Sequence, residues 1–169
     1  MKIIVSTERL FLSEITEKDA AFIYELMNDA AWIKNIGNRN IKSLQDAENY
    51  ITEKFIKSYN KNGFGFYAIR LKGSKIPIGT CGLIKREGLD AMDIGYGLLP
   101  LFRGKGYAFE ATKAMYKYGY EVLKEPKIIA IVNPNNKTSI ALIEKLGMTF
   151  EKMIKLPKET EAIKLFSPS

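Results

Sequence analysis

One segment combines glycines, positive charge and the start of a helical pattern: Arg103 to Phe109, with the sequence RGKGYAF. The first backbone N–H groups of a helix have no intrahelical partner and lie at the positive end of the helix dipole. Glycine has no Cβ, so a Gly-rich backbone can approach a ligand closely. We therefore predict that the backbone of Gly104 to Phe109 binds a phosphate or a pyrophosphate.

Two common phosphate-binding motifs do not describe this segment. A Walker loop requires GxxxxGK[ST], which the sequence lacks, and the dinucleotide fingerprint GxGxxG requires a third glycine where Phe109 stands. On the two glycines alone, a tight turn that only joins a strand to a helix is an equally good interpretation. The predicted elements on either side of the segment are needed to distinguish a phosphate-binding turn from a turn that only connects.

The segments on either side fit a strand and a helix. Residues Asp93 to Leu99 are apolar and interrupted by glycines, which predicts a buried strand that Pro100 ends. Apolar residues then recur at helical spacing from Ala108 to Val122, and Pro126 closes this helix. A strand that leads through a Gly-rich turn into a helix is the geometry that a pyrophosphate site needs.

A second strand and helix follow in the C-terminal third of the chain. Ile128 to Val132 predicts a strand, and Lys137 to Leu146 predicts a short helix. Asn136 is well placed as the N-cap of this helix, and Gly147 as the residue after its end.

Three blocks of the sequence, in order along the chain, resemble one enzyme family. Arg103-x-x-Gly106-x-Ala108 is similar to the [RQ]-x-x-G-x-[GA] signature of the GNAT acyl-CoA N-acyltransferases. The segment from Asn136 to Met148 is similar to that family's N-x-x-S-x-x-L-x-E-K-x-G-F block. Thr7 to Leu12 resembles the opening of its RimJ/RimL-type branch, the ribosomal-protein N-terminal acetyltransferases. The resemblance covers almost the whole chain.

The resemblance implies an N-acetyltransferase in which an amine attacks acetyl-CoA directly in a ternary complex, with no acyl-enzyme and no metal. It implies that the backbone of Tyr96, Gly97 and Leu98 faces the pantetheine and the thioester. The other CoA-binding residues that it assigns are Arg103, Gly104, Lys105, Gly106, Tyr107, Ala108, Phe109 and Asn136. The acceptor amine stays open among a protein N-terminus, a polyamine, an aminoglycoside and a small amino compound.

Two residues are predicted to move protons. Asp93 lies on the strand before the Gly-rich turn, where many relatives have an acid, and it is the best candidate for the general base, with Glu87 as a weaker one. The alternative interpretation of Asp93 is an exposed charge at the end of a strand. Ser139 matches the serine that the RimJ/RimL branch proposes as the acid for the departing thiolate. The alternative for Ser139 is a contact with Asn136 that only caps the helix.

The sequence departs from the family pattern at two places. Ile143 stands where many members have a tyrosine acid, and Leu99-Pro100-Leu101 replaces an acidic residue of the RimJ/RimL branch. These departures affect the acceptor and the proton route, and they leave the CoA-binding residues intact.

Composition excludes several other classes of protein. The 169 residues include no histidine, which rules out a Ser-His-Asp triad and a His-ligated metal site. No apolar run approaches the ~18 residues of a membrane span, and Glu8 comes too early for a signal peptide. The single cysteine, Cys81, predicts a core residue in a reducing, cytoplasmic protein.

The net charge of +7 is unevenly distributed, with −1 in residues 1–60 and +8 in residues 61–169. Nucleic acid is a rival partner for a basic chain, but the lysines are scattered and no nucleic-acid recognition signature is present. The phosphates of CoA account for the bias more economically. A catalytically weak acyl-CoA-binding sensor or regulator remains the alternative function, and a homodimer remains open.

The whole sequence predicts a single α+β domain over residues 1–169. Its elements favour one mixed, mainly antiparallel sheet with helices on both faces, and the resemblance implies that this sheet is splayed at the acyl-CoA site. Residues 29–40 are predicted as a loop. Within this loop, Trp32, Ile33 and Ile36 either pack on the core or line the acceptor mouth. The other predicted elements are strands at 3–5, 10–12, 64–71, 76–84, 150–155 and 162–166, and helices at 17–28 and 44–59.

Overall fold

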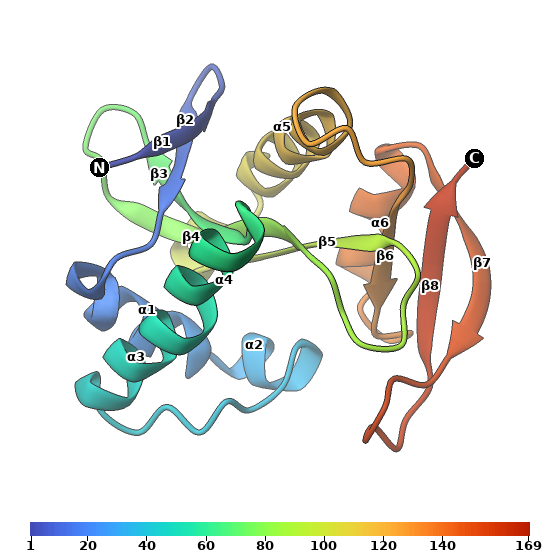
Figure 1. The fold of residues 1–169 in the computed structure, drawn as a ribbon, viewed down its shortest axis with the longest axis horizontal. Coiled ribbons are helices and arrows are strands. Elements are labelled where there is room, and N and C mark those ends of the chain that lie inside the picture. The colour runs from blue at the N-terminus through green and yellow to red at the C-terminus, as the bar shows by residue number, and fades with distance from the viewer.

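The computed structural model describes residues 1–169 and is organised around one eight-stranded sheet, in the order β1-β2-β3-β4-β5-β6-β8-β7 (Figure 1). All neighbouring strands are antiparallel except β5 and β6, which are parallel. The strands are β1 (Ile3–Ser6), β2 (Leu10–Glu14), β3 (Phe66–Leu71), β4 (Pro77–Ile84), β5 (Met92–Leu98), β6 (Ile128–Val132), β7 (Met148–Ile154) and β8 (Ile163–Pro168). The predicted α+β fold with a mixed, mainly antiparallel sheet is confirmed.

Helices cover both faces of this sheet, with α5 and α6 on one face and the four helices of the N-terminal part on the other (Figure 1). The helices are α1 (Ala20–Met27), α2 (Ala30–Asn35), α3 (Leu44–Tyr50), α4 (Lys57–Asn62), α5 (Tyr107–Glu121) and α6 (Lys137–Lys145). A π-helical segment (Ile51–Ile56) joins α3 to α4, and 3₁₀ turns precede α1 (Glu17–Asp19) and α5 (Pro100–Phe102). None of the helices has the length and hydropathy that crossing a bilayer requires.

Two apolar cores form, one on each face of the sheet, because side chains along a strand alternate between the faces. On β3, Tyr67 and Ile69 belong to the core under α5 and α6, whereas Ala68 belongs to the core under α1 and α3. On β5, Ile94 and Leu98 belong to the core under α5 and α6. The odd-numbered residues 93, 95 and 97 of β5 therefore face the N-terminal helices.

The sheet opens at β5. This strand pairs with β4 along its whole length, from Asp93 opposite Ile84 to Leu98 opposite Gly79. Its parallel pairing with β6 is confined to Met92 and Asp93. Beyond Asp93 one edge of β5 has no strand partner, so the sheet is splayed at the place that the resemblance implies.

The segment predicted as a loop contains a helix, α2, so that prediction is wrong. The Asp29 side chain caps this helix by accepting a hydrogen bond from the Trp32 backbone N–H, at 3.2 Å. Asp is a good N-cap and alanine, at positions 30 and 31, is the best helix former, so the local signal was present but short. The helix places Trp32 against β5.

Candidate active site

The backbone between β5 and α5 forms an anion cradle. None of the six N–H groups from Gly104 to Phe109 donates to a protein acceptor, and the first hydrogen bond of the helix is made by Glu110 N–H to the Gly106 carbonyl. Gly104 and Gly106 have φ values of +75° and +83°, in the left-handed region that glycine tolerates. Six unpaired N–H groups at a helix N-terminus fit the oxygens of a pyrophosphate.

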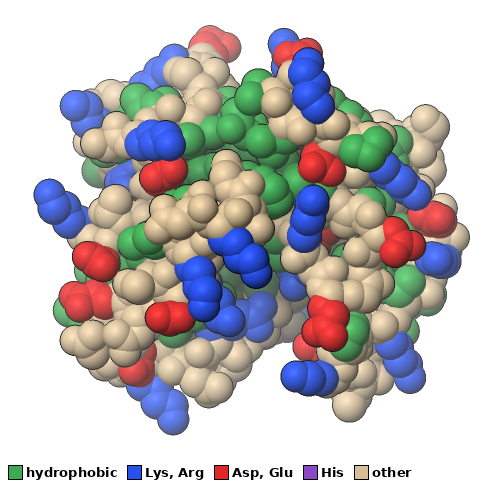
Figure 2. Space-filling model, viewed as in Figure 1, with side chains coloured by type: hydrophobic (Ala, Val, Ile, Leu, Met, Phe, Trp, Pro, Cys, Tyr) green, Lys and Arg blue, Asp and Glu red, His purple; other side chains and the backbone are tan.

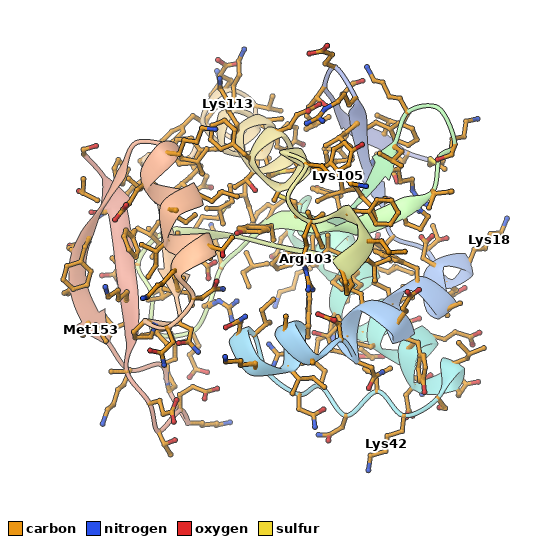
Figure 3. The ribbon with its side chains drawn as sticks, turned by 180° about the vertical axis from the view of Figure 1, so that it is seen from behind. Lys18, Lys42, Arg103, Lys105, Lys113 and Met153 are labelled. Atoms are coloured by element: carbon orange, nitrogen blue, oxygen red, sulfur yellow. The ribbon has the colours of Figure 1, made fainter.

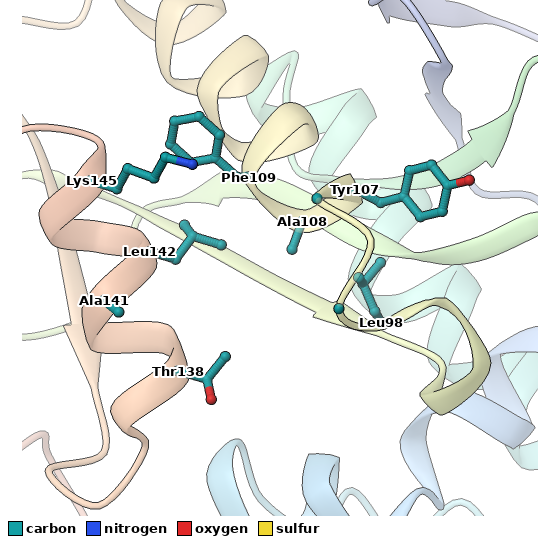
Figure 4. Close-up of a pocket in the computed structure, with 10 residues that line it drawn as sticks. Leu98, Tyr107, Ala108, Phe109, Thr138, Ala141, Leu142 and Lys145 are labelled. Carbon is teal, nitrogen blue, oxygen red and sulfur yellow. The ribbon is translucent and has the colours of Figure 1, made fainter.

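A pocket of about 240 Å³ extends from the cradle between α5 and α6 (Figure 4). Its walls are Leu98 of β5, the first turn of α5, and one face of α6; the lining residues are Leu98, Gly104, Gly106, Tyr107, Ala108, Phe109, Thr138, Ala141, Leu142 and Lys145. The Lys145 ammonium lies 4.1 Å from the centre of the Phe109 ring. The pocket is therefore mainly apolar with one cation at its rim, which suits a pantetheine arm and a phosphorylated end.

The open edge of β5 offers unpaired backbone groups to this pocket. Residues of an antiparallel strand bond alternately to the two sides, and the Leu99 N–H bonds to the Ile78 carbonyl of β4. The register then directs the peptide groups of Gly97 toward Thr80 of β4, and those of Tyr96 and Leu98 into the splay. The register therefore gives no support to the predicted contact of the Gly97 backbone with the pantetheine, because it directs the hydrogen bonds of Gly97 to β4.

Gly97 lies against the helix α2. A Cβ at this position would lie 2.5 Å from Cζ3 of Trp32 and 3.7 Å from Cδ1 of Ile36, so the indole ring rests on the glycine. Trp32 is buried whereas Ile36 is 39% exposed, so the first packs on the core and the second borders solvent. Two buried polar atoms beside this contact have no partner: Nε1 of Trp32, and Oγ1 of Thr80, the residue opposite Gly97 on β4.

Asp93 is buried at the closed end of the splay, on the same face as Gly97. Only 1% of the residue is exposed, so the interpretation as an exposed strand-end charge is wrong. Its carboxylate accepts a hydrogen bond from Nε of Arg86, in an ion pair. Burial raises the pKa of Asp93, and the charge and hydrogen bond of Arg86 oppose that rise. A carboxyl with a raised pKa is a stronger base, and this supports the predicted role; the rival Glu87 is exposed.

Tyr96 on β5 and Ser139 on α6 lie on the two sides of the splay. Asn136 caps α6 by accepting the Ser139 backbone N–H at 3.2 Å, which confirms the predicted N-cap. Burial raises the pKa of the Tyr96 hydroxyl, and a hydrogen bond with the Ser139 side chain opposes the rise. Ile143 is buried in the core. The Tyr96 side chain was not predicted as a site residue from the sequence; the available signal was a tyrosine at an even-numbered position of a Gly-rich strand.

Arg103 has partners outside the cradle. Its Nη2 donates to the Leu98 carbonyl at 2.9 Å and to Oδ2 of Asp29 at 2.5 Å, and its Nε donates to the same carbonyl at 3.2 Å. The predicted role of its side chain as a CoA ligand therefore finds no support in this arrangement. Figure 3 shows Arg103 reaching from the start of the cradle toward the N-terminal helices.

The turn between β1 and β2 supports the cradle from the other side. Glu110, in the first turn of α5, accepts hydrogen bonds from the Thr7 hydroxyl at 2.6 Å and from Nε of Arg9 at 2.7 Å. Arg9 also donates to the Lys105 carbonyl at 3.0 Å. Burial alone would raise the pKa of Glu110, but the bonds from Thr7 and Arg9 lower it below its ordinary value. These contacts fix the cradle, and they give a physical role to the Thr7–Leu12 block.

Two further predictions concern chemistry outside the cradle. Cys81 is buried beside Thr112 of α5, and burial raises the pKa of its thiol to about 12, which confirms it as a core residue. No group of three or more His, Cys, Asp or Glu side chains is arranged to hold a metal ion.

Residues 9–149 match the family model described as an acetyltransferase (GNAT) domain. The chain is 30% identical to the uncharacterized N-acetyltransferase YnaD of Bacillus subtilis (strain 168), over 93% of this chain and 90% of that protein. The crystal structure of a GNAT-family acetyltransferase from Bacillus anthracis matches with a TM-score of 0.79 and 27% identity, over 96% of both chains. RimL, the ribosomal L7/L12 alpha-N-protein acetyltransferase, solved with coenzyme A, matches with a TM-score of 0.83 over 98% and 97% of the two chains; at 17% identity it shows the shared fold.

The chain therefore belongs to the GNAT acetyltransferase family. The matched residues include the open strand β5, the cradle and α6, so the family assignment and the site geometry concern the same part of the molecule. The protein is an acetyltransferase enzyme, and the resemblance stated from the sequence is confirmed at the level of the family.

Proposed function

We propose that this protein is an acetyl-CoA-dependent N-acetyltransferase that acetylates a primary amine in a ternary complex, within a RimJ/RimL-like branch of the family. The observation that carries the proposal is the row of six unpaired N–H groups from Gly104 to Phe109, which continues from the open edge of β5. A pyrophosphate on the cradle directs the pantetheine arm along that edge. The thioester then lies near Tyr96 and Leu98.

Each part of acetyl-CoA has fitting residues. The cradle N–H groups, with Lys105 nearby, hold the pyrophosphate, and the apolar walls made by Leu98, Phe109 and Leu142 contain the pantetheine. The Asn136 side-chain oxygen caps α6, which leaves its amide nitrogen to donate to the ligand. When bound, acetyl-CoA supplies an activated acyl group; an N–H of Tyr96 or Leu98 stabilises the oxyanion that forms on its carbonyl.

The residues around the thioester suit the proton transfers that aminolysis requires. A base first takes one proton from the ammonium; the amine nitrogen then bonds to the acyl carbon, the C–S bond breaks, and the second proton leaves the nitrogen for solvent. Asp93 faces the acceptor side of β5 and serves as that base, directly or through water. On the opposite face, the Ser139 hydroxyl provides a proton to the departing thiolate and regains one from water.

The acceptor side favours an amine with a single positive charge. Two carboxylates on this face, Asp93 of β5 and the α2 N-cap Asp29, are already paired, Asp93 with Arg86 and Asp29 with Arg103. A polyamine or an aminoglycoside has several ammonium groups and needs unpaired carboxylates to bind them. Figure 2 shows Lys and Arg side chains around a hollow below the position of β5, which agrees with this preference. A protein N-terminus or a small monoamine is therefore our proposed acceptor.

Homodimer formation and a cytoplasmic location stay predictions.

The second candidate function is a catalytically weak acyl-CoA-binding regulator. The specific observation in its favour is that Ile143 occupies the place of the usual tyrosine acid and that the Asp93 carboxylate is buried in an ion pair. Such a protein binds acetyl-CoA as tightly as an enzyme does but does not accelerate thiol release when amines are added.

Thiol release across a panel of amines tests the proposal. The panel contains short peptides with free N-termini, amino acid amides, spermidine and an aminoglycoside, each supplied with acetyl-CoA. We expect stimulation by members that carry one amine and little by the polycations. Tight CoA binding without stimulation by any member would favour the regulator, and absence of CoA binding would contradict both functions.

A further inference from the structure

We propose that Arg103 and Asp29 are positioning residues that fix the acceptor-side helix α2 to the open end of β5. The inference rests on the proposed function, and it gives the first residue of the cradle segment a role on the acceptor side. It concerns a contact between residues 74 positions apart.

The Arg103 guanidinium joins two elements at one point. Its bonds to the Leu98 carbonyl hold the last residue of β5, at 2.9 Å and 3.2 Å, and its bond to Asp29 holds the first turn of α2, at 2.5 Å. The planar fork of arginine allows these donors to act together, which the single ammonium of lysine does not. The Asp29 side chain is 14% exposed and that of Arg103 is 42% exposed, so the pair is only partly screened by solvent.

Asp29 performs two tasks with one carboxylate. It caps α2 through the Trp32 N–H at 3.2 Å, and it accepts the bond from Arg103. Burial raises its pKa, but the hydrogen bond from Arg103 and the one from the Trp32 N–H outweigh burial and lower the pKa below its ordinary value. The start of α2 is therefore tied to the cradle segment by charge as well as by packing.

The consequence of this tie is the position of Trp32. The indole rests on Gly97, next to Leu98, whose carbonyl Arg103 holds. Leu98 lines the CoA pocket on one face of β5, and Gly97 meets the acceptor-side helix on the other. Arg103 thus fixes the position of α2 relative to the end of β5, and so the position of the acceptor relative to acetyl-CoA. It does so without contact with either substrate.

Two variants isolate the ion pair from other effects. Asp29→Asn removes the charge but keeps a residue that caps helices equally well. Arg103→Gln removes the charge and the fork. Lys117→Gln is the matched control, because it breaks an exposed ion pair with Glu121 on α5, of 4.0 Å, away from the pocket.

Three readouts separate this role from phosphate binding. The first is the Kd of CoA by titration calorimetry. The second is acrylamide quenching of Trp32, which is the only tryptophan and so reports α2 alone, with no need for an acceptor. The third is the acceptor dependence of kcat/KM, with an amine that the wild-type protein acetylates.

We expect both variants to increase Trp32 quenching and to lower kcat/KM for the acceptor by roughly 10–100-fold, as a displaced positioning element does. The Kd of CoA should change by less than about twofold, and kcat/KM of the double variant should be no lower than that of the more impaired single variant.

A rise in the CoA Kd of about tenfold or more in Arg103→Gln alone would make Arg103 a phosphate ligand and overturn the proposal. Unchanged quenching in both variants would overturn it as well. If wild-type protein does not bind CoA, the proposed function fails instead.

Discussion

The two sides of β5 are built by different means. On the side that we propose for CoA, the polar groups belong mainly to the backbone: six unpaired N–H groups in consecutive residues of the cradle, and the peptide groups of Tyr96 and Leu98 at the open edge. The acceptor side consists of side chains from distant parts of the chain, where Trp32 covers Gly97 and Arg103 bonds to Asp29. One side depends on the local course of the backbone, and the other on tertiary contacts.

Because of this difference, substitutions are expected to have different effects on the two sides of β5. A backbone site tolerates most side chains, since only positions with positive φ or close approach require glycine. A side-chain site is sensitive at each contact, because removing one partner leaves the other without its bond. Substitutions on the two sides should therefore alter CoA affinity and acceptor turnover independently.

The largest effect is expected from Gly106→Glu on the CoA side. Glutamate must adopt a φ of +83° and places a negative charge in the anion cradle. We expect CoA affinity to fall by at least ~100-fold, since several charge-assisted bonds are lost. Titration calorimetry measures the effect. Gly147→Glu is the control, because it carries a similar backbone penalty at φ +96° with open space around it; it should bind CoA normally. Equal CoA affinity in Gly106→Glu and wild type would make the cradle only a turn.

Asp93→Asn should affect turnover without affecting CoA affinity. A positioned general base contributes a factor of about 100 or more. The pKa of Asp93 is raised, so its ionised fraction falls as pH is lowered through that value, and wild-type kcat/KM should fall with it. The defect of Asp93→Asn should be greatest between the pKa of Asp93 and that of the acceptor, where the carboxylate is ionised and few acceptor molecules are neutral. Below the pKa of Asp93 the wild-type carboxyl is protonated as well, so the defect should narrow there. It should shrink as pH rises past the acceptor's own pKa, about 7.7–8.0 for an α-amino group.

Arg86→Gln sharpens the same experiment. Its charge lowers the pKa of Asp93, so its removal should move the acidic limb of the pH–rate profile to higher pH. A profile that is identical in wild type, Arg86→Gln and Asp93→Asn would show that bulk water carries the proton.

Gly97→Ala tests the acceptor side by its packing. The added Cβ would lie 2.5 Å from Cζ3 of Trp32, so the indole must move. We expect kcat/KM for the acceptor to fall by roughly tenfold, with the CoA Kd within about twofold of wild type. Gly73→Ala is the control, since no atom lies within 4 Å of its added Cβ. A CoA Kd that rises as much as kcat/KM falls would show that the two sides are not separate.

The smallest effect is expected from Ser139→Ala. A thiol of pKa about 8.5 leaves with only moderate help from an acid at neutral pH, so a loss of a few-fold in kcat is expected. An acyl donor whose thiol has a much lower pKa should restore the rate of Ser139→Ala and leave Asp93→Asn impaired. If the low-pKa donor does not restore the rate, Ser139 has only a structural role, in the first turn of α6 that Asn136 caps.

The fold and the local geometry of the cradle and of α6 were predictable from the sequence, because their signals are local. Glycine at 104 and 106, the N-cap Asn136 and the end of α6 at Gly147 each depend on a few neighbouring residues, and the structure places each as the local pattern indicates. The helix α2 was missed because it is only six residues long, and much of its support comes from Arg103.

The acceptor side was not predictable, because its contacts join distant residues. The ion pair of Asp93 with Arg86 depends on the register of β4 and β5 across their connecting turn, so the alternative interpretation of Asp93 as exposed was wrong. The direction of the Gly97 peptide groups likewise depends on which neighbour β5 bonds to at each residue. Strand alternation places these groups correctly only once the pairing is known.

The most direct test of the central claim is amide hydrogen exchange with and without saturating desulfo-CoA, which has the phosphates and pantetheine but no reacting thiol. We expect slower exchange at the cradle amides of Gly104 to Phe109 and at those of Tyr96 and Leu98. The Gly97 amide already bonds to β4, so it should change only with the overall stabilisation of the protein by the bound ligand. Unchanged exchange at the cradle, Tyr96 and Leu98 under saturating ligand would contradict the account, because the ligand would then bind elsewhere.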